Sequence, residues 1–167
     1  MLSRGLVATP VGDIHYIVDE VGVRAISAPS RSSDEWQVLL RRRGLARLPA
    51  CADEFDLHGL RRQLSEYING ERRTFYLPLC VSGTPFQLKV WEALQAIPYG
   101  EVRTYADIAR EIGSPLAARA VGQANNQNPF AIVVPCHRVV VSSGLGGYAG
   151  GPASKEFLLA LEKRSRE

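Results

Sequence analysis

A cysteine, a histidine and an arginine follow one another in the pentapeptide 135–139 (PCHRV), close to the carboxy-terminal end of the chain. The apolar run 130–134 directly precedes them, so these side chains belong to the end of a buried segment. A thiolate is a strong nucleophile, and a nearby imidazole can take the proton of the thiol. Free cysteine is also one of the most buried residue types and usually behaves as an inert apolar side chain. Other residues must therefore decide whether Cys136 is reactive.

The composition is that of an ordinary globular protein. Of the 167 residues, 46% are hydrophobic and 22% are charged, which indicates neither a disordered chain nor a membrane protein. No apolar stretch reaches the roughly 20 residues of a membrane-spanning helix, and the first residues lack the pattern of a signal peptide. We therefore expect a cytoplasmic protein with no membrane partner. The net charge of +3 is compatible with a nucleic-acid partner without requiring one.

The cysteines do not form a recognisable framework. Cys51, Cys80 and Cys136 are odd in number, and no two of them have the CxxC spacing. This pattern argues against both a set of disulfides and a zinc site. It leaves Cys136 as a free thiol.

Residues 1–80 have the pattern of a small α/β domain. Short runs rich in β-branched residues, separated by turn residues, predict a β-meander with strands at 5–9, 14–19 and 23–28. Helical spacing and a further extended run then predict helices at 34–43 and 56–69 and a strand at 74–80. The segment 81–83 is interpreted as a linker, because the pattern changes to helices after it.

Residues 84–167 are predicted to form a second, mainly helical domain. Thr84, Pro85 and Gln87 have the spacing of a capped helix start. A capped helix from 104 that ends at glycine, followed by a helix at 116–125, matches the helix-turn-helix pattern of DNA-binding proteins. On the second of these helices Arg119 is flanked by small residues and is the expected DNA-facing side chain. The remaining predicted elements are a strand at 131–134, a glycine-rich loop at 142–151 and a helix at 154–164.

Taken together, these motifs closely resemble those of the O6-alkylguanine-DNA alkyltransferases, also called methylated-DNA:protein-cysteine methyltransferases. The resemblance runs through residues 84–167 in order and at the family's spacing, and it is weaker before Gly83. The matching features are the PCHRV motif, the segment 118–122 (ARAVG), the step Asn128-Pro129, Tyr148 in the glycine-rich loop and Glu162 in the last helix. The resemblance implies a two-domain α/β (α+β) chain. Its first domain is a ribonuclease H-like α/β support domain, and its second is a winged helix-turn-helix-like domain that binds DNA and accepts the alkyl group.

The resemblance also implies a reaction. A member of this family flips O6-alkylguanine out of duplex DNA and transfers the alkyl group irreversibly to its own cysteine, here Cys136. The expected substrate is chiefly O6-methylguanine, with O4-methylthymine as a second one, and each molecule reacts once. No cofactor is implied. The expected partner is double-stranded DNA containing O6-alkylguanine, bound by a monomer, with cooperativity on DNA left open.

Roles for individual residues follow from the same resemblance. His137 takes the thiol proton through a water, and Glu162 orients His137. Tyr105 donates a proton to the leaving guanine, and Asn128 braces the turn that carries the cysteine. Arg119 is the arginine finger that fills the place of the flipped base.

Further residues are implied in DNA binding and in the substrate pocket. Ala118, Gly122 and Tyr105 are expected to contact DNA together with Arg119. The residues expected to line the substrate pocket are Pro129, Val139, Tyr148, Ala149 and Gly150.

The chain differs from the mammalian members of the family in three respects. The loop 142–148 is one residue shorter than in the mammalian form. Asn125 and Gln127 occupy positions in the recognition helix and the following loop at which the mammalian form has different residues. No cysteine precedes Cys51. We therefore expect no structural zinc, and the range of accepted alkyl groups stays open.

Three other functions are compatible with parts of the sequence. A noncatalytic sensor of alkylated DNA would share the DNA-binding half but would lack the acceptor, which is present here as Cys136. A helix-turn-helix regulator would not need the PCHRV motif. A cysteine hydrolase with a Cys-His-Glu arrangement would leave the helix-turn-helix unexplained.

Overall fold

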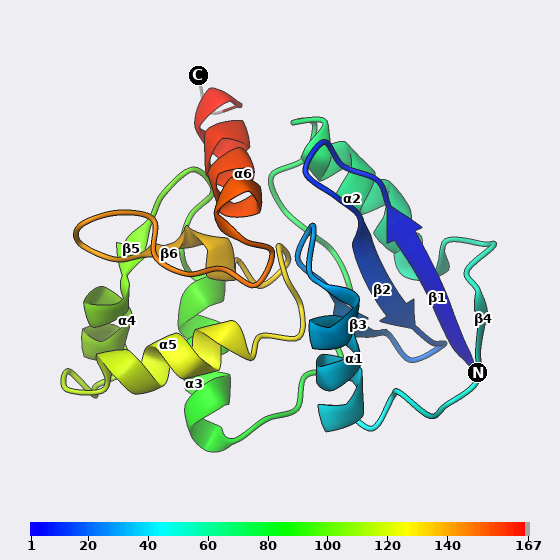
Figure 1. Cartoon of the computed structure of the whole chain (residues 1–167), viewed down its shortest axis with the longest axis horizontal. Helices are drawn as coiled ribbons and strands as arrows, with labels where there is room; N and C mark the ends of the chain where they lie inside the picture. Colours follow the sequence, from blue (N-terminus) through cyan, green and yellow to red (C-terminus); the bar gives the residue numbers. More distant parts are fainter. Residues whose placement is uncertain (166–167) are drawn as a thin grey trace.

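The computed structural model describes residues 1–165, which form a sheet-containing amino-terminal part and a helical carboxy-terminal part (Figure 1). The sheet has four strands in the order β3-β2-β1-β4. Its strands are β1 (Leu2–Val7), β2 (Ile14–Val18), β3 (Val23–Ile26) and β4 (Ala50–Ala52). Strands β1, β2 and β3 form an antiparallel meander, as predicted, whereas β4 pairs parallel with β1.

The two faces of the sheet are covered by different helices. Side chains of neighbouring residues in a strand point to opposite faces, and here Tyr16 joins the main core whereas Ile17 joins a second, smaller one. The helix α2 (Leu60–Ile68) contributes Leu64 to the main core, and α1 (Ser33–Arg42) contributes to the smaller one.

The predicted strand at 74–80 does not form. Leu79 makes a single isolated bridge with Val23, and the segment is otherwise extended without a partner strand. Pro78 has no backbone N–H and so cannot donate to a sheet, although its carbonyl accepts from Val23 N at 2.8 Å.

The helix predicted at 56–69 begins only at Leu60. Asp56 and His58 both have positive φ, 52° and 63°, so the preceding turn, η1 (Leu57–Gly59), is not continuous with α2. The side chain of Asp56 accepts hydrogen bonds from the N–H groups of Arg61 and Arg62, at 2.6 and 3.1 Å, and thereby caps the helix.

The carboxy-terminal part contains four helices and a small parallel sheet among the described residues. These elements are α3 (Pro85–Gln95), β5 (Arg103–Thr104), α4 (Tyr105–Glu111), α5 (Ala118–Asn126), η2 (Cys136–Arg138), β6 (Val139–Val140) and α6 (Pro152–Arg164). The predicted caps are confirmed, because Thr84 and Thr104 both form complete capping boxes. The second helix of the helix-turn-helix begins at Ala118, two residues later than predicted, and Leu116 is fully exposed.

The predicted strand at 131–134 is wrong. The segment is a tight turn in which Val134 N donates to Phe130 O at 2.9 Å, and Ile132 has a φ of 71°. Phe130 and Ile132 are buried, so the apolar run correctly indicates burial but does not indicate a strand. The turn ends at Pro135, directly before Cys136.

One hydrophobic core connects the two parts of the chain. Tyr16 and Leu64 belong to the same buried cluster as Leu94 and Leu158. The division into domains 1–80 and 84–167 with a linker at 81–83 stays a prediction. Within residues 1–165, no helix has the length and apolar character that crossing a membrane requires.

Candidate active site

Cys136 lies on the wall of a cavity of about 490 Å³ between α5, the glycine-rich loop and the segment that follows β3. Only 6% of the residue is exposed. Other predicted site residues on the same wall are Tyr105, Arg119, Gly122, Asn128, Tyr148 and Ala149. The fold thus brings most of the predicted site together from segments up to 44 residues apart (Tyr105 to Ala149).

Asn128 holds the turn that presents the cysteine. Its Nδ2 donates to the carbonyl of Val134 at 2.7 Å, and its Oδ1 accepts from the N–H of Phe130 at 2.9 Å. Asn125 adds a longer contact of 3.4 Å from Nδ2 to the carbonyl of Cys136. The two amide side chains thus form hydrogen bonds with backbone groups that lie outside the α-helices and sheets. Because these groups have partners, the irregular turn can be buried.

His137 and Glu162 form a buried pair directly behind the cysteine. His137 Nε2 lies 2.8 Å from Glu162 Oε1, and neither residue has measurable exposure. An ionised carboxylate only accepts hydrogen bonds, so Nε2 carries the hydrogen and Nδ1 keeps its lone pair. Nδ1 is buried and has no hydrogen-bond partner among residues 1–165. The imidazole is therefore oriented with one nitrogen free to accept a proton.

Glu162 has three further partners. The guanidinium of Arg138 contacts both carboxylate oxygens, with Nε to Oε2 and Nη2 to Oε1 each at 2.9 Å. The N–H of Gly100 donates to Oε2 at 3.1 Å, and the hydroxyl of Tyr67 donates to Oε1 at 2.6 Å. Burial by itself raises the pKa of Glu162, but His137 and Arg138 outweigh this effect and hold the pKa well below its usual range. The carboxylate is consequently ionised at neutral pH.

The resting thiol is protonated. Burial raises the pKa of Cys136, against a smaller opposing effect of Asn128 and of the charges of Lys155 and Arg31. Burial also lowers the pKa of His137, although Glu162 acts in the opposite direction. The thiol and the imidazole are therefore both neutral at rest, so the thiol needs a proton acceptor in order to react.

Lys155 fixes the loop on the other side of the pocket. Its buried ammonium group donates to the carbonyls of Val139 and Gly147 at 2.5 and 3.1 Å. Desolvation lowers the pKa of Lys155 to about 8, partly offset by Cys136. The contact with Gly147 holds the loop beside Tyr148.

The helix-turn-helix lies next to this cavity. Arg119 is exposed near the beginning of α5, and Tyr105 stands at the beginning of α4. Burial raises the pKa of Tyr105, with Cys136 as a second cause. The phenol is thus a protonated donor at neutral pH.

Four of the residues predicted for DNA binding or for the substrate pocket do not lie on the cavity wall. Ala118 is the first residue of α5, and Val139 is buried in β6. The carbonyl of Pro129 accepts from Ile26 N at 2.8 Å. Gly150 packs so closely that a Cβ there would lie 2.1 Å from the carbonyl oxygen of Pro29. The structure places Pro129, Val139 and Gly150 where they support the pocket.

Sequence reasoning missed four residues of the site. Tyr67 has the helical spacing of a core residue, and nothing in the sequence connects it with Glu162. Arg138 belongs to the PCHRV motif but has no role assigned from the sequence, and it is buried against that carboxylate. Lys155 and Arg31 carry charge close to the cysteine. Lys155 was detectable as one of only three lysines in an arginine-rich chain.

No metal centre accompanies this arrangement in the part of the chain that the structure describes, where no group of three His, Cys, Asp or Glu side chains is placed to hold an ion.

The fold and the site together define a DNA-binding protein of the helix-turn-helix class with a buried cysteine as its reactive group. Residues 85–164 match the family model described as the DNA-binding domain of 6-O-methylguanine DNA methyltransferase. The chain is 45% identical over 159 residues to the constitutive methylated-DNA–protein-cysteine methyltransferase of Bacillus subtilis. The aligned residues cover 94% of this chain and 93% of the Bacillus protein. The chain therefore belongs to the methylated-DNA–protein-cysteine methyltransferase family, as predicted.

Other relatives agree. The methyltransferase of Methanosarcina acetivorans is 59% identical over 102 residues, which are 60% of this chain and 65% of that one. The crystal structure of the O6-methylguanine methyltransferase of Mycobacterium tuberculosis superimposes with a TM-score of 0.82 at 37% identity, over 99% of this chain and 94% of that one. A structure of the mycobacterial protein in complex with DNA gives a TM-score of 0.80 at 38% identity, over 98% and 94% of the two chains. The predicted α/β fold class is confirmed.

Proposed function

We propose that the protein repairs alkylated DNA by direct reversal, transferring an alkyl group from O6 of guanine to Sγ of Cys136. The observation that carries the proposal is the buried cysteine on the wall of a cavity beside a helix-turn-helix, with the His137–Glu162 pair behind it. Membership of a family of methylated-DNA–protein-cysteine methyltransferases supports the same reaction. The protein is an enzyme with DNA as its partner.

The reaction begins with the proton of the thiol. His137 Nδ1 accepts this proton through a water, and the imidazolium is stabilised by Glu162. The thiolate attacks the alkyl carbon, so that the carbon–sulfur bond forms while the carbon–oxygen bond to O6 breaks. The electron pair of the broken bond passes to the guanine.

The leaving guanine then needs one proton. Tyr105 donates it at the ring nitrogen N3 and recovers one from the protonated His137 through solvent. The thiol loses one proton in total and the guanine gains one, so the products are normal guanine and a thioether at Cys136. Because no step in the site cleaves a thioether, each molecule reacts once and no cofactor is consumed.

A stacked base cannot reach Cys136, because the sulfur lies inside the protein. The nucleotide must leave the duplex, at a cost of a few kcal/mol. Arg119 is exposed on the rim of the cavity and is suited to fill the vacated place by stacking its planar guanidinium. Tyr148 and Ala149 line the cavity on the side of the glycine-rich loop and contact the flipped base.

We also propose which substrates the protein accepts, its oligomeric state and the compartment in which it acts. The substrates are chiefly O6-methylguanine and also O4-methylthymine in double-stranded DNA. A monomer performs the reaction, in the cytoplasm, where the free thiols of all three cysteines persist.

Protein mass provides the test. Purified protein is mixed with a duplex that contains one O6-methylguanine, and the intact mass and the modified peptide are measured. We expect one added methyl group on Cys136 and no more than one event per molecule. An unmodified protein would support the sensor or regulator alternative, and repeated turnover would contradict the acceptor role.

A further inference from the structure

A second cleft, of about 380 Å³, lies between the end of α1, the segment 82–83, α3 and the end of α5. Its polar lining is formed by three arginines, three amides and one hydroxyl: Arg31, Arg42, Arg43, Gln87, Asn126, Gln127 and Ser82. No acidic residue lines it. The cleft therefore combines cations with neutral hydrogen-bond donors, which is the chemistry of an anion site.

The arginines of this cleft have no carboxylate partners. None of the three forms an ion pair within residues 1–165, where seven other arginines pair with a carboxylate. Burial lowers the pKa of both Arg31 and Arg43, and the nearby charge of Arg42 lowers that of Arg31 further. Glu35 is close enough to oppose this effect on Arg31 without pairing with it. Grouped, partly desolvated cations of this kind are stabilised by a bound anion.

Part of the cleft is already rigid. Arg43 donates to the carbonyls of Cys80 and Ser82, each at 3.3 Å, and its guanidinium packs 5.6 Å from the centre of the Phe130 ring. Gln87 and Gln127 are joined by a hydrogen bond of 2.5 Å. In contrast, Arg31 Nε is buried without a hydrogen-bond partner in the described chain. The site therefore offers unused donors on a fixed wall.

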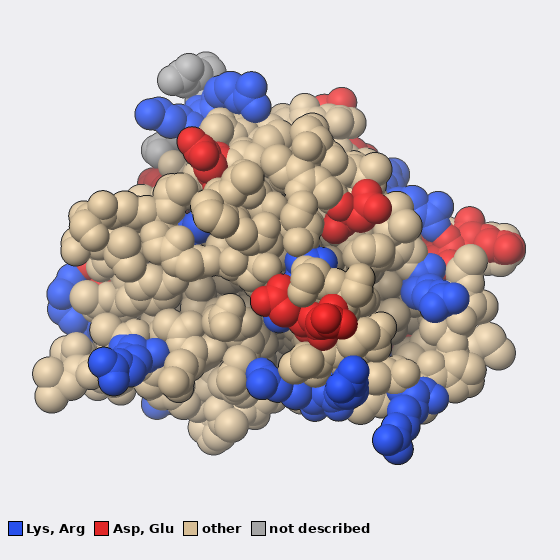
Figure 2. Space-filling model, viewed as in Figure 1, with Lys and Arg blue, Asp and Glu red and all other residues tan. Residues whose placement is uncertain are grey.

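The cleft is adjacent to the cavity of Cys136. Arg31 and Asn126 line both of them, and α5, which carries Arg119 near its beginning, reaches the cleft with its last residues. Figure 2 shows Lys and Arg side chains along the lower edge of the molecule, from the region of α5 to the region below α1. This second cleft, called the arginine cleft below after Arg31, Arg42 and Arg43, therefore lies next to the place where a flipped nucleotide would enter the cavity.

We propose that the arginine cleft binds a phosphodiester group of the DNA strand beside the flipped nucleotide, so that α1 of the amino-terminal part belongs to the DNA-binding surface. The inference rests on the proposed function for the position of the strand. Arginine is suited to this role, because its planar fork donates two hydrogen bonds to phosphate. A free phosphate compound has the same chemistry and is the alternative occupant.

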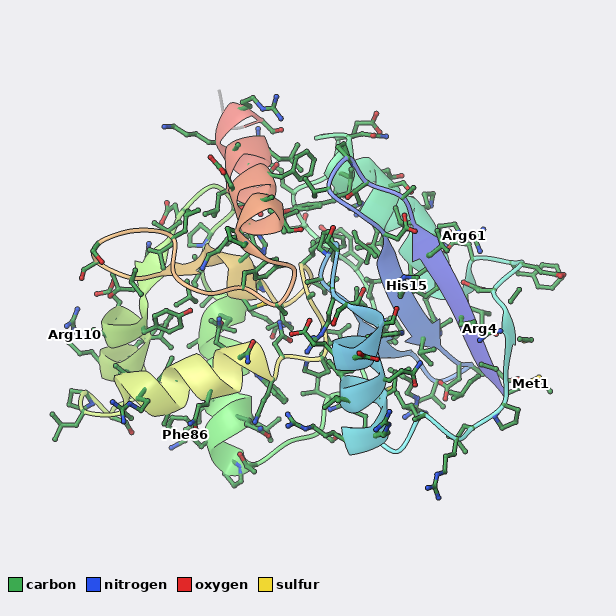
Figure 3. The ribbon with its side chains drawn as sticks, in the orientation of Figure 1. Met1, Arg4, His15, Arg61, Phe86 and Arg110 are labelled. Carbon is green, nitrogen blue, oxygen red and sulfur yellow. The ribbon has the colours of Figure 1, made fainter. Side chains whose placement is uncertain are left out.

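The salt dependence of DNA binding tests the proposal. The affinity for an unmodified duplex, which cannot react, is measured by fluorescence anisotropy over a series of salt concentrations. Each phosphate contact adds about 0.9 to the slope of log affinity against log salt. We expect Arg42→Ala to weaken binding and to reduce this slope by about one. The matched control is Arg4→Ala, an exposed arginine on β1 at the opposite side of the molecule from α5 (Figure 3). It removes the same charge and should leave the slope unchanged.

The remaining outcomes are separable. An unchanged slope in Arg42→Ala, with the thermal midpoint also unchanged, would overturn the proposal. Equal reductions in Arg42→Ala and Arg4→Ala would do the same, because the effect would then be one of net charge. Inorganic phosphate that raises the thermal midpoint of the wild-type protein but not of Arg42→Ala, together with an unchanged slope, would assign the cleft to a free anion. Failure of the wild-type protein to gain a methyl group from a duplex that contains O6-methylguanine would contradict the proposed function, independently of these slopes.

Discussion

The hydroxyl of Tyr67 donates a hydrogen bond of 2.6 Å to Oε1 of Glu162, a residue 95 positions further along the chain. The same hydroxyl lies 3.4 Å from Nε2 of His137. Tyr67 belongs to α2 in the amino-terminal part, whereas Glu162 belongs to α6. The amino-terminal part therefore contributes directly to the orientation of the proposed base, and it does more than support the second domain.

Tyr67→Phe is predicted to change the pH dependence of alkyl transfer. Loss of this donor leaves more negative charge on Glu162, which raises the pKa of His137, because Glu162 already acts in that direction. Neutral His137 is needed to accept the thiol proton, so activity is lost as the pH falls through this pKa. We expect the acid limb of the reaction with O6-benzylguanine to move to higher pH. The measurement is the rate of Cys136 benzylation between about pH 5 and pH 8.

Other charged and titratable groups near the pair are unchanged in this variant. They are Arg138 and Lys155, which both lower the pKa of His137, and Tyr148. Tyr99→Phe is the matched control, because the Tyr99 hydroxyl is buried without a partner in the described chain and its ring packs edge-on against Tyr67 at 6.2 Å. If both variants kept the wild-type pH profile, the contact between Tyr67 and Glu162 would be structural only.

Cys136→Ala is predicted to separate DNA binding from alkyl transfer. The sulfur is the proposed acceptor, so transfer should be abolished. The residues proposed to face DNA lie on α4 and α5, outside the turn that carries Cys136. Affinity for a duplex with one O6-methylguanine, measured by anisotropy, should stay near the wild-type value. A large loss of affinity would show that Cys136 is needed for the shape of the site.

The sequence predicted which residues the fold brings together better than it predicted the backbone around them. Cys136 and His137 were recognisable because their residue types carry chemistry, and the caps at Thr84 and Thr104 because they depend on local spacing. The strand predicted at 131–134 failed because burial alone does not distinguish a strand from a turn braced by a side chain such as Asn128. The contact of Tyr67 with Glu162 joins two distant helices, and a tyrosine at helical spacing gives no sign of such a partner.

Arg119→Ala is predicted to weaken repair of duplex DNA far more than reaction with free O6-benzylguanine. In the proposed mechanism the arginine replaces the stacking of the flipped base, and one stacking contact contributes about 1–3 kcal/mol. A loss in the duplex reaction of about 5- to 150-fold is therefore expected. Rates for the two substrates are measured by intact mass, with Arg4→Ala as the control for lost charge. Equal losses with both substrates would contradict a role in base flipping.

Glu162→Gln is predicted to reduce both stability and activity. The change leaves Arg138 buried without its carboxylate, and breaking a buried ion pair in this way costs about 3–5 kcal/mol. The amide can also donate to His137 Nε2, which would leave the imidazole in the wrong tautomer, so transfer to Cys136 should slow. The free energy of unfolding is obtained from urea titrations, and the rate from benzylation of Cys136.

The pH dependence of stability distinguishes this effect from a packing defect. The pKa of Glu162 in the folded protein lies below the usual value of 4.5, so its contribution to stability is present above that pH and is lost as the pH falls further toward the folded pKa. The wild-type protein should therefore lose stability in acid more steeply than Glu162→Gln. Glu156→Gln, an exposed position on the same helix, should retain the wild-type dependence. Parallel curves for all three proteins would mean that the carboxylate of Glu162 is not held ionised by His137 and Arg138.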